Sequence, residues 1–433
     1  MNKHLHVQRC INCRAEFDLD ARLYVCSHCG GLLDIERSEK FDVSSFKELW
    51  LKRRSSLDAR DRSGVWRFRE FLPFVDDAAV ISLAEGNTPL YDAPRSADYC
   101  RLPALKLKHQ GCNPTGSFKD TGMTVAITQA RKLGARLVVC ASTGNTAASL
   151  AAYAARADLL CAIIVPEGQV SHAKLAQALD YGAKVLEVDG NFDTCMNVIR
   201  ELAEDPAVYL VNSINPFRIE GQKTVAFELC EQLEWRMPDH LVVPGGNLGN
   251  SSAFGKGFRE LLSSGLIDRQ PKITVIQAEG AAPFARFYAD DGYDRLLNEK
   301  HPQTLATAIK IGAPVSWQKA WRAVNETNGS VITVSEQEIA DAKAVIGRDG
   351  IGCEPASATT VAGIRKLVND GVIKEDESVV AVLTGHLLKD TDYVIKYHNQ
   401  SLIAPDGIQL TGTFGNSPIR VKSDLRSIRE ICG

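Results

Sequence analysis

Beyond residue 105, short runs rich in Val, Ile and Leu alternate with longer runs in which apolar and polar residues are mixed. The short runs do not alternate between apolar and polar positions, which is typical of strands covered on both faces. The predicted strands are 136–142, 160–166, 185–189, 208–212, 241–244, 273–278 and 379–384. The mixed runs predict helices at 120–133, 146–156, 171–181, 192–203 and 220–235, and the capping-box pattern Ser335-Glu336-Gln337-Glu338 predicts the start of another. Repeated strand–helix units predict an α/β fold with mostly parallel sheets.

The first 35 residues have a different pattern and form a separate small unit. Two C-x2-C pairs, Cys10 with Cys13 and Cys26 with Cys29, are separated by twelve residues. Each pair places two thiolates at one tight turn, and two such turns together give a tetrahedral four-sulfur site. Zinc is the metal that this set favours, with iron as the alternative; two disulfides or four idle thiols are the interpretations without a metal. Because four protein ligands leave no open position, we expect a structural zinc ribbon.

Residues 36–80 are charged, with Trp50 and Trp66 placed among Lys and Arg. The run 46–57 predicts an amphipathic helix that packs the ribbon onto the body. Basic residues beside aromatic ones also occur in nucleic-acid-binding proteins, but Asp and Glu are interleaved here, which favours a solvated helix face. The following segment, 83–90, predicts a turn whose polar residues either serve the turn itself or face a ligand.

Composition narrows the class of protein. The chain has 433 residues, 45% of them hydrophobic, and a net charge of −3 without a basic block, so charge gives no argument for nucleic acid or an anionic membrane. The N-terminus lacks the apolar core of a signal peptide, and the most apolar stretch, 147–165, contains Arg156 and Asp158, which predicts a buried helix and strand instead of a membrane span. Most of the twelve cysteines stand singly in apolar or helical segments. That usage is typical of a reducing cytosol, and we expect a soluble cytoplasmic protein.

Three loops of small and polar residues follow predicted strands, at 142–146, 245–250 and 384–386. Ligands of open α/β sheets bind at the carboxyl ends of the strands, in loops of this kind. In 245–250 the glycines let backbone N–H groups turn toward one point, and the helix that follows favours an anion at its start. This loop is therefore a candidate phosphate cradle. It is neither a P-loop nor a dinucleotide fingerprint, and tight-turn glycines remain the alternative.

Lys119 is the candidate catalytic residue. It ends the stretch Asn113-Pro114-Thr115-Gly116-Ser117-Phe118-Lys119, just before a predicted helix for which Ser117 is the favoured N-cap. The start of a helix disfavours a cation, and this field together with burial would lower the pKa of the amine and make it a nucleophile able to form a Schiff base. A solvated surface lysine is the alternative.

Five motifs in one order resemble the threonine synthases, which are pyridoxal-phosphate enzymes of fold type II, the tryptophan-synthase-β-like group. They are N-P-T-G-S-F-K-D at 113–120, S-T-G-N-T-A-A-S at 142–149, N-S-I-N-P-F-R-I-E-G-Q-K-T at 212–224, G-G-N-L-G-N at 245–250 and L-T-G-H-L-L-K-D at 383–390. The resemblance covers residues 80–395, and the four-cysteine ribbon resembles a segment found on some members of the family.

The resemblance implies an architecture and partners. Two three-layer α/β domains with mostly parallel sheets would follow the ribbon of residues 1–35. The large domain would comprise 36–111 and 221–433, and a small mobile domain would comprise 112–220. The family also implies a homodimer that acts on a small phosphorylated amino acid. From the charge pattern we expect no nucleic-acid or membrane partner.

The resemblance further implies pyridoxal phosphate as the cofactor. Lys119 would hold it as a Schiff base and then carry protons, and the backbone of Gly245, Gly246, Asn247, Leu248, Gly249 and Asn250 would hold its phosphate. Asn145 would hydrogen-bond the 3′-oxygen of the cofactor, and Thr384 would face the pyridine nitrogen, where a neutral hydroxyl does not force that nitrogen to stay protonated. Turn capping is the alternative role for Asn145 and Thr384.

The substrate implied by the family is O-phospho-L-homoserine, which is converted with water to L-threonine and phosphate by γ-elimination and β-addition. A dianionic leaving group needs cationic and hydrogen-bonding partners. Arg218 and Asn212 match the phosphate-binding stretch of the family, and Ser142, Thr143 and Thr146 would assist. A structural salt bridge is the alternative role for Arg218.

Two departures from the family pattern keep the substrate choice open among related phosphorylated or hydroxylated amino acids. Asp120-Thr121-Gly122 stands where the family often has Asp-Arg-Gly, and Gly245-Gly246-Asn247 where it often has Val-Gly-Asn. The closest rivals are β-replacement enzymes like cysteate synthase and enzymes like threonine dehydratase. Dehydratases commonly carry Gly-Asn-His and a run of four glycines, so Gly144-Asn145-Thr146 favours the synthase. A third hypothesis, a binding ribbon on an inactive body, predicts loss of Lys119 or of the phosphate loop, and both are present.

Overall fold

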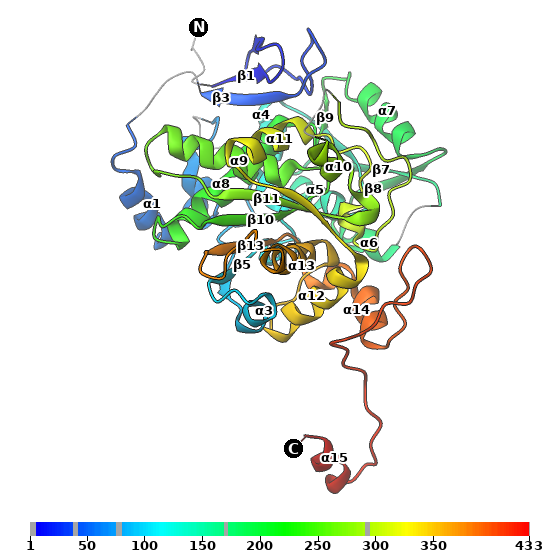
Figure 1. Ribbon diagram of the computed structural model, residues 1–433. Helices are drawn as coiled ribbons and strands as arrows, with labels where there is room; N and C mark the ends of the chain where they lie inside the picture. The colour runs from blue at the N-terminus through cyan, green and yellow to red at the C-terminus, as the bar shows by residue number, and fades with distance from the viewer. Residues whose placement is uncertain (1–5, 38–41, 75–79, 169–171, 291–294, 433) are drawn as a thin grey trace.

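The computed structural model of this chain describes residues 6–37, 42–74, 80–168, 172–290 and 295–432. Figure 1 shows a body of two mostly parallel sheets covered by helices, a small N-terminal sheet on one side of it, and a C-terminal helix that lies away from it. This architecture confirms the α/β class and the mostly parallel sheets. It also places the loops that follow the strands of the larger sheet next to the turn that carries Lys119.

Six strands form the larger sheet, in the order β12–β11–β10–β13–β5–β4. Their bounds are β4 (Leu90–Asp92), β5 (Leu105–His109), β10 (His240–Pro244), β11 (Lys272–Ala278), β12 (Val331–Val334) and β13 (Val379–Leu383). All neighbours are parallel except β4, which pairs antiparallel with β5 at one edge. Because β13 pairs with β5 up to the register Leu383–His109, the loop that follows β13 lies beside the turn that leads to Lys119.

Helices cover both faces of this sheet. One face packs on α3 (Pro94–Cys100), α12 (Glu336–Arg348) and α13 (Pro355–Asn369), through alternate strand residues such as Val242 and Ala381. The other face packs on α8 (Pro216–Gln232), α9 (Gly249–Ser263), α10 (Pro283–Ala289) and α11 (Trp317–Glu326), through residues such as Val243 and Val382. Burial on both faces explains why the strands read as continuous apolar runs.

The smaller sheet has four parallel strands in the order β8–β7–β6–β9. They are β6 (Leu137–Ala141), β7 (Leu160–Pro166), β8 (Lys184–Val188) and β9 (Val208–Leu210). Val138 and Cys140 pack toward α4 (Lys119–Lys132), α5 (Asn145–Arg156) and α6 (His172–Asp180), whereas Val139 and Ala141 pack toward α7 (Phe192–Leu202). Asn145 therefore begins the helix that directly follows β6.

Two glycines allow α4 and α8 to pack in close contact. A Cβ at Gly221 of α8 would overlap the backbone carbonyl of Thr121, and a Cβ at Gly122 of α4 would lie 2.7 Å from the carbonyl oxygen of Arg218. These distances are shorter than any side chain tolerates, so only glycine allows the contact. The close packing brings Lys119, at the start of α4, toward Arg218 in the first turns of α8.

The predicted strands begin and end within two residues of the observed ones, and the capping box at Ser335 and Glu338 is confirmed. The prediction omitted β4, β5 and β12; β5 carries Lys106 and Lys108 among its apolar residues and so lacks a continuous apolar run.

The predicted helix 220–235 begins earlier, at Pro216. Residue 171, the predicted start of another helix, lies outside the described residues. The predicted domain boundary at 220 and 221 falls inside α8, and the division into domains stays a prediction.

The N-terminal unit is an antiparallel sheet of β1 (His6–Cys10), β2 (Glu16–Phe17) and β3 (Leu33–Arg37), seen at the top of Figure 1. It contacts the body directly. Nζ of Lys132 on α4 lies 2.7 Å from a carboxylate oxygen of Asp20, and the hydroxyl of Tyr24 accepts the backbone N–H of Leu210 at 2.7 Å. The prediction that the helix after residue 46 packs the ribbon onto the body is wrong. That helix, α1 (Phe46–Arg54), buries Trp50 against Phe227 of α8 instead.

The remaining elements lie outside the two sheets. The short helix α2 (Ala59–Arg62) follows α1, and α14 (Thr391–His398) follows the larger sheet. The last helix, α15 (Leu425–Cys432), ends the extended segment at the bottom of Figure 1. Residues 147–165, the most apolar stretch, form most of α5 and all but the last residue of β7, as predicted. Across the described ranges, we find no helix with the length and apolar character needed to span a membrane.

Candidate active site

Lys119 is the first residue of α4, and a buried carboxylate fixes the turn before it. Asp120 accepts the backbone N–H of Thr115 at 2.7 Å, the hydroxyl of Thr115 at 2.6 Å and the hydroxyl of Ser149 at 2.6 Å. The sequence predicts Ser117 as the N-cap of α4, and this prediction is wrong. Phe118 occupies that position, and the Ser117 hydroxyl accepts the backbone N–H of Lys119 at 3.4 Å. The three bonds to Asp120 hold the turn, and so they set where the Lys119 side chain begins.

The amine of Lys119 is a weak base for a lysine. Burial and the neighbouring guanidinium of Arg218 lower its pKa to about 7, although the carboxylate of Glu354 partly opposes this shift. The ring of Phe118 lies 3.9 Å from Nζ. A large fraction of the amine is therefore unprotonated near neutral pH, which is the form that attacks a carbonyl. The alternative of a solvated surface lysine does not fit this environment.

The loop after β13 pairs with the turn before Lys119. The backbone N–H of Phe118 donates to the carbonyl of Thr384 at 2.9 Å, and the N–H of His386 donates to the carbonyl of Gly116 at 2.9 Å. Thr384 is buried, and its hydroxyl lies 3.1 Å from the hydroxyl of Ser357. The backbone pairing thus brings Thr384 next to Lys119, although the two are far apart in sequence.

The loop at 245–250 connects β10 to α9. Leu248 has the positive φ of 63° and occupies the N-cap position, so no side chain caps the start of α9. The hydroxyl of Ser251 in the first turn is buried and has no hydrogen-bond partner among the described residues. Uncapped N–H groups beside a buried free hydroxyl form a site that suits a phosphate. The glycine pattern predicts the loop but gives no signal for Ser251.

Two contacts connect this cradle to the Lys119 turn. The amide of Asn250 donates to the side-chain oxygen of Gln110 at 3.0 Å, and Gln110 stands three residues before Asn113 in the same turn. The side chain of Gln222 on α8 lies between Gly122 of α4 and Gly249 of the cradle. The cradle and Lys119 therefore belong to one site.

Arg218 is a buried cation with no counter-ion among the described residues. Its Nη1 donates weakly to the carbonyl of Val211 at 3.4 Å, and its Nε has no hydrogen-bond partner. In the part of the chain that the structure describes, no carboxylate pairs with it, and burial lowers its pKa to about 10. The structural salt bridge that was the alternative role for Arg218 is therefore not formed by any residue that the structure describes. An unpaired buried guanidinium is costly, and such a group suits an anionic ligand.

Asn145, in the first turn of α5, faces a residue that sequence analysis missed. Its amide donates to Oε2 of Glu354 at 3.0 Å, and the Thr384 hydroxyl donates to Oε1 of the same carboxylate at 3.2 Å. Glu354 stands at the N-cap position of α13, directly before Pro355. Proline at the first position of a helix was the signal in the sequence that could have located this carboxylate.

Asn212 is bound to the backbone of the smaller sheet. Its amide oxygen accepts the N–H of Ala141 at 3.0 Å and its amide nitrogen donates to the carbonyl of the same residue at 3.1 Å. This pair fixes the end of β6, and with it the loop that carries Ser142, Thr143 and Thr146. All three are half-buried at the start of α5, on the loop that leads to Asn145. The geometry gives Asn212 a positioning role and leaves one amide hydrogen for a ligand.

The segment 83–90 serves the fold instead of the site. The carboxylate of Glu85 accepts the hydroxyl of Tyr153 at 2.7 Å and the backbone N–H of Leu83 at 3.0 Å. Thr88 bonds through its N–H and its hydroxyl to Glu228 of α8, at 2.8 and 3.1 Å. Because these polar groups already have partners within the protein, the turn role proposed for this segment is the one that fits.

These residues fit pyridoxal phosphate. The site has an amine with a lowered pKa, an uncapped helix start with a free buried hydroxyl, and the polar side chains of Asn145 and Thr384 on either side of one carboxylate. The Lys119 amine could hold the aldehyde of the cofactor, and the start of α9 with Ser251 could hold its phosphate. Asn145 and Thr384 could hold its ring.

The four cysteines of the ribbon form a second site. The Sγ atoms of Cys10, Cys13, Cys26 and Cys29 all lie within 4.8 Å of one another. Backbone N–H groups of Asn12 and His28 point at the sulfurs of Cys10 and Cys26, each at 3.4 Å, as expected where thiolates must be stabilised. Four sulfurs in this arrangement fit a metal ion. A metal set is favoured over two disulfides, because all four thiols are free.

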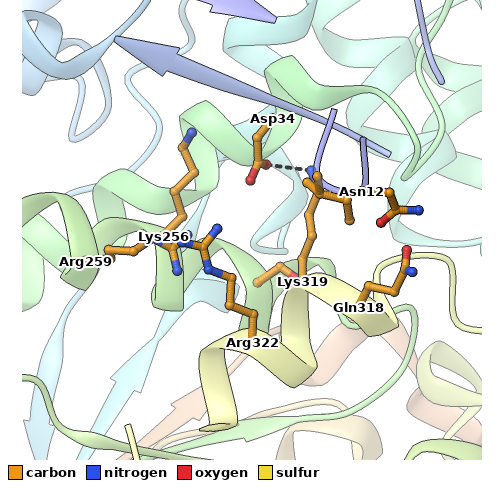
Figure 2. Close-up of a pocket in the computed structure, with 9 residues that line it drawn as sticks. Asn12, Asp34, Lys256, Arg259, Gln318, Lys319 and Arg322 are labelled. Atoms are coloured by element: carbon orange, nitrogen blue, oxygen red, sulfur yellow. Dashed lines mark hydrogen bonds and ion pairs between the residues drawn. The ribbon is translucent and has the colours of Figure 1, made fainter. Parts of the chain in front are cut away.

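A pocket between the ribbon and the body, shown in Figure 2, is lined by cations that are already paired. Lys319 lies 2.7 Å from Asp34 of the ribbon, and Lys256 lies 2.9 Å from Glu220. Arg259 and Arg322 both bind Glu326, at 2.6 and 2.7 Å. With its charges satisfied, this pocket joins the ribbon to α9 and α11, and it is separate from the site of Lys119.

Comparison with known proteins places this geometry in a family. Residues 81–385 match the model of the family described as pyridoxal-phosphate dependent enzyme. A threonine synthase of Methanocaldococcus jannaschii is 44% identical over 98% of this chain and 99% of its own length. Threonine synthases of Methanosarcina acetivorans and Mycobacterium tuberculosis are 46% and 45% identical, over 89% and 76% of this chain and 93% and 89% of their own lengths.

Solved structures agree in fold. The crystal structure of threonine synthase from Escherichia coli matches 98% of this chain and 99% of its own, with a TM-score of 0.69 at 18% identity. Serine racemase from Dictyostelium discoideum matches 70% of this chain and 92% of its own, with a TM-score of 0.57. The first match covers nearly all of this chain, whereas the second covers 70% of it.

Proposed function

The chain belongs to the threonine synthase family of pyridoxal-phosphate-dependent enzymes, and from this premise we propose that it converts O-phospho-L-homoserine and water into L-threonine and phosphate. The observation that carries the proposal is the buried, unpaired Arg218 beside the low-pKa amine of Lys119. An enzyme that releases phosphate from an amino acid needs a cation for the phosphate and a base for the carbon-bound protons.

We assign the cofactor-binding roles as follows. Lys119 would hold the cofactor, the loop 245–250 with Ser251 would bind its phosphate, and Asn145 and Thr384 would bind its ring. When bound, pyridoxal phosphate supplies an electron sink for the carbanions that form when protons leave the substrate. The lowered pKa of Lys119 then lets its amine accept a proton from carbon and return it near neutral pH.

Arg218 would bind the phosphate of the substrate as its counter-ion, with Asn212, Ser142, Thr143 and Thr146 as hydrogen-bond donors around it. Charge-assisted hydrogen bonds to phosphate are among the stronger polar interactions. Because the guanidinium is already desolvated, most of the cost of its burial is met during folding, so little of the binding energy is lost when the substrate enters.

Further assignments rest on the resemblance and on chemistry. We assign zinc to the four-cysteine site, since soft thiolates in a closed tetrahedral set select it. We place the protein in the cytoplasm as a homodimer, with 112–220 as the mobile domain. Free, buried cysteines such as Cys140 and Cys230 are consistent with a reducing compartment.

A substrate panel tests the proposed function. Purified protein loaded with pyridoxal phosphate is given O-phospho-L-homoserine, or O-phospho-L-serine with sulfite, or L-threonine, and each product is quantified. Threonine formation from the first substrate alone supports the proposal. Cysteate from the second substrate, or 2-oxobutanoate from the third, at a higher rate would assign one of the rival activities instead.

A further inference from the structure

Glu354 is a buried carboxylate in the middle of the site, and the proposed function gives it no role. It is 4% exposed and stands at the N-cap position of α13, but it caps no N–H of that helix. Its backbone N–H donates to the carbonyl of Gly385 at 3.0 Å, which fixes the residue against the loop after β13. A buried carboxylate that does not serve its own helix must be held there for another purpose.

The loop after β13 has the shape that this carboxylate needs. A Cβ at Gly385 would overlap the carboxyl carbon of Glu354, so only glycine leaves room for it. The hydroxyl of Ser357, one turn into α13, accepts the backbone N–H groups of Thr384 and Gly385 at 2.8 and 3.0 Å. The start of α13 and the Thr384 loop therefore form one rigid unit.

The hydrogen bonds around Thr384 have one consistent direction. Because the Ser357 oxygen already accepts two backbone N–H groups, its own hydrogen is free for the Thr384 hydroxyl, 3.1 Å away. Thr384 then donates its hydrogen to Oε1 of Glu354 at 3.2 Å. What Thr384 still offers to a ligand is a lone pair.

Asn145 is oriented by the same group. Its amide nitrogen donates one hydrogen to Oε2 of Glu354 at 3.0 Å, which distinguishes the nitrogen from the oxygen of this amide. Its second N–H and its oxygen remain for a ligand. One carboxylate thus controls both side chains that the proposed function gives to the cofactor ring.

We propose that Glu354 is a positioning residue of the active site, whose carboxylate fixes the directions in which the Asn145 amide and the Thr384 hydroxyl hydrogen-bond to the ring of the cofactor. This inference rests on the proposed function, because it takes Asn145 and Thr384 to be ring ligands. The charged groups that face Glu354 are Lys119 of α4 and Lys389 of the segment after β13; both favour its anion, while burial raises its pKa.

Glu354→Gln tests the proposal, because glutamine keeps the size but replaces one acceptor oxygen with a donor. Either Asn145 or Thr384 must then turn away from its present bond. We expect the apo variant to bind pyridoxal phosphate about tenfold more weakly in equilibrium dialysis, as expected for one charge-assisted hydrogen bond. We also expect the nitrogen NMR signal of cofactor isotopically labelled at the ring nitrogen to move, since the displaced side chain changes its hydrogen bond to the ring.

Glu336→Gln is the matched control. Glu336 is a partly buried carboxyl in the first turn of α12 that accepts the backbone N–H of Leu305 at 3.3 Å, and its pKa is also raised by burial. This variant should match the wild type in cofactor affinity and in the ring-nitrogen signal. Thermal unfolding of each apo protein separates a loss of folding from a loss of binding.

The outcomes are distinguishable. If Glu354→Gln matches the control in affinity and in the ring-nitrogen signal, Glu354 does not position the ring ligands. If affinity falls only as far as thermal stability falls, with an unchanged ring-nitrogen signal, the role is structural and the proposal is also overturned. If Glu354→Gln shows the expected loss of cofactor affinity and the expected shift of the ring-nitrogen signal, but the wild type makes no threonine, the proposed reaction fails while the positioning role stands.

Discussion

Arg218 lowers the pKa of Lys119 across the contact between α8 and α4, and within the described residues it has no carboxylate partner of its own. Two like charges held in one buried region cost folding free energy. Such unfavourable arrangements occur at functional sites, and here the arrangement produces both an unprotonated amine and a site for an anion. This arrangement places both requirements of the proposed reaction in one place.

Arg218→Met should therefore separate stability from function. Removing an unpaired buried cation should raise the free energy of unfolding of the apo protein by about 1–3 kcal/mol. The same change should lower kcat/KM for the phosphorylated substrate by about a hundredfold or more, because the phosphate loses its counter-ion. Denaturant unfolding in phosphate-free buffer and steady-state kinetics measure the two effects.

Arg156→Met on the exposed end of α5 is the control for this pair of measurements and should change stability by less than about 0.5 kcal/mol. A large loss of stability in Arg218→Met would show that the guanidinium is a structural group with a partner that it needs for folding.

The titration of Lys119 should appear in the pH dependence of stability. Its pKa is about 7 in the folded protein against an ordinary value of 10.5. Between these values the unfolded chain binds a proton that the folded chain does not, so the free energy of unfolding rises with pH. The lowered pKa of Lys119 therefore destabilises the folded protein fully below about pH 7, and the effect is absent above the ordinary pKa of 10.5.

The comparison protein for this measurement is Lys119→Met, which cannot titrate. The difference in unfolding free energy, wild type minus variant, should rise with pH across that window in the apo proteins. A flat difference would show that the amine has an ordinary pKa in the folded protein.

Gly221→Ala should displace α8 from α4. Its Cβ would overlap the carbonyl of Thr121, so we expect a loss of about 1–3 kcal/mol in stability and a lower cofactor affinity, because Lys119 on α4 moves relative to the loop 245–250 that would bind the cofactor phosphate. Gly347→Ala on α12 is a matched helical glycine with no atom within 4 Å of the new Cβ. It should stabilise the protein by up to about 1 kcal/mol, and thermal unfolding with cofactor titration tests both variants.

Metal removal should affect the ribbon more than the chemistry. The purified protein should contain one zinc per chain, and Cys13→Ser should remove it and lower the thermal midpoint. We expect kcat to change less than about threefold, because the ribbon contacts the body through residues such as Lys132 and Lys319, and none of its described residues supplies a group to the site. Cys432→Ser, an exposed cysteine outside the cluster, is the control. Metal content equal in both variants would contradict the assignment.

The sequence features on which most of the predictions rest are local. The turn before Lys119, the loop at 245–250 and the four cysteines each have a short pattern with a direct physical meaning. The same holds for the parallel strands, whose apolar runs follow from burial on both faces. The confirmed elements are those whose signal lies within a few residues.

The parts that sequence missed depend on contacts between distant segments. Glu354 and Ser251 gain their meaning only when α13 and α9 meet the Lys119 turn. Pro355 marks the start of a helix but not the side chains that the Glu354 carboxylate binds, and no local pattern marks the buried Ser251 hydroxyl as one without a partner. Ser117 has the right side chain for an N-cap, but its backbone pairs with Gly385, so Phe118 takes the cap position. The run at 46–57 predicted a helix correctly but not the surface against which Trp50 packs.

The most direct test of the central claim is a product assay in water enriched in heavy oxygen, with O-phospho-L-homoserine as substrate and Lys119→Ala as the paired variant. The account predicts threonine and phosphate in equal amounts from the wild type, with the heavy oxygen on the hydroxyl of threonine, and no threonine from the variant. Homoserine with phosphate would reveal simple hydrolysis, and threonine formation at an undiminished rate by Lys119→Ala would contradict the role given to this lysine.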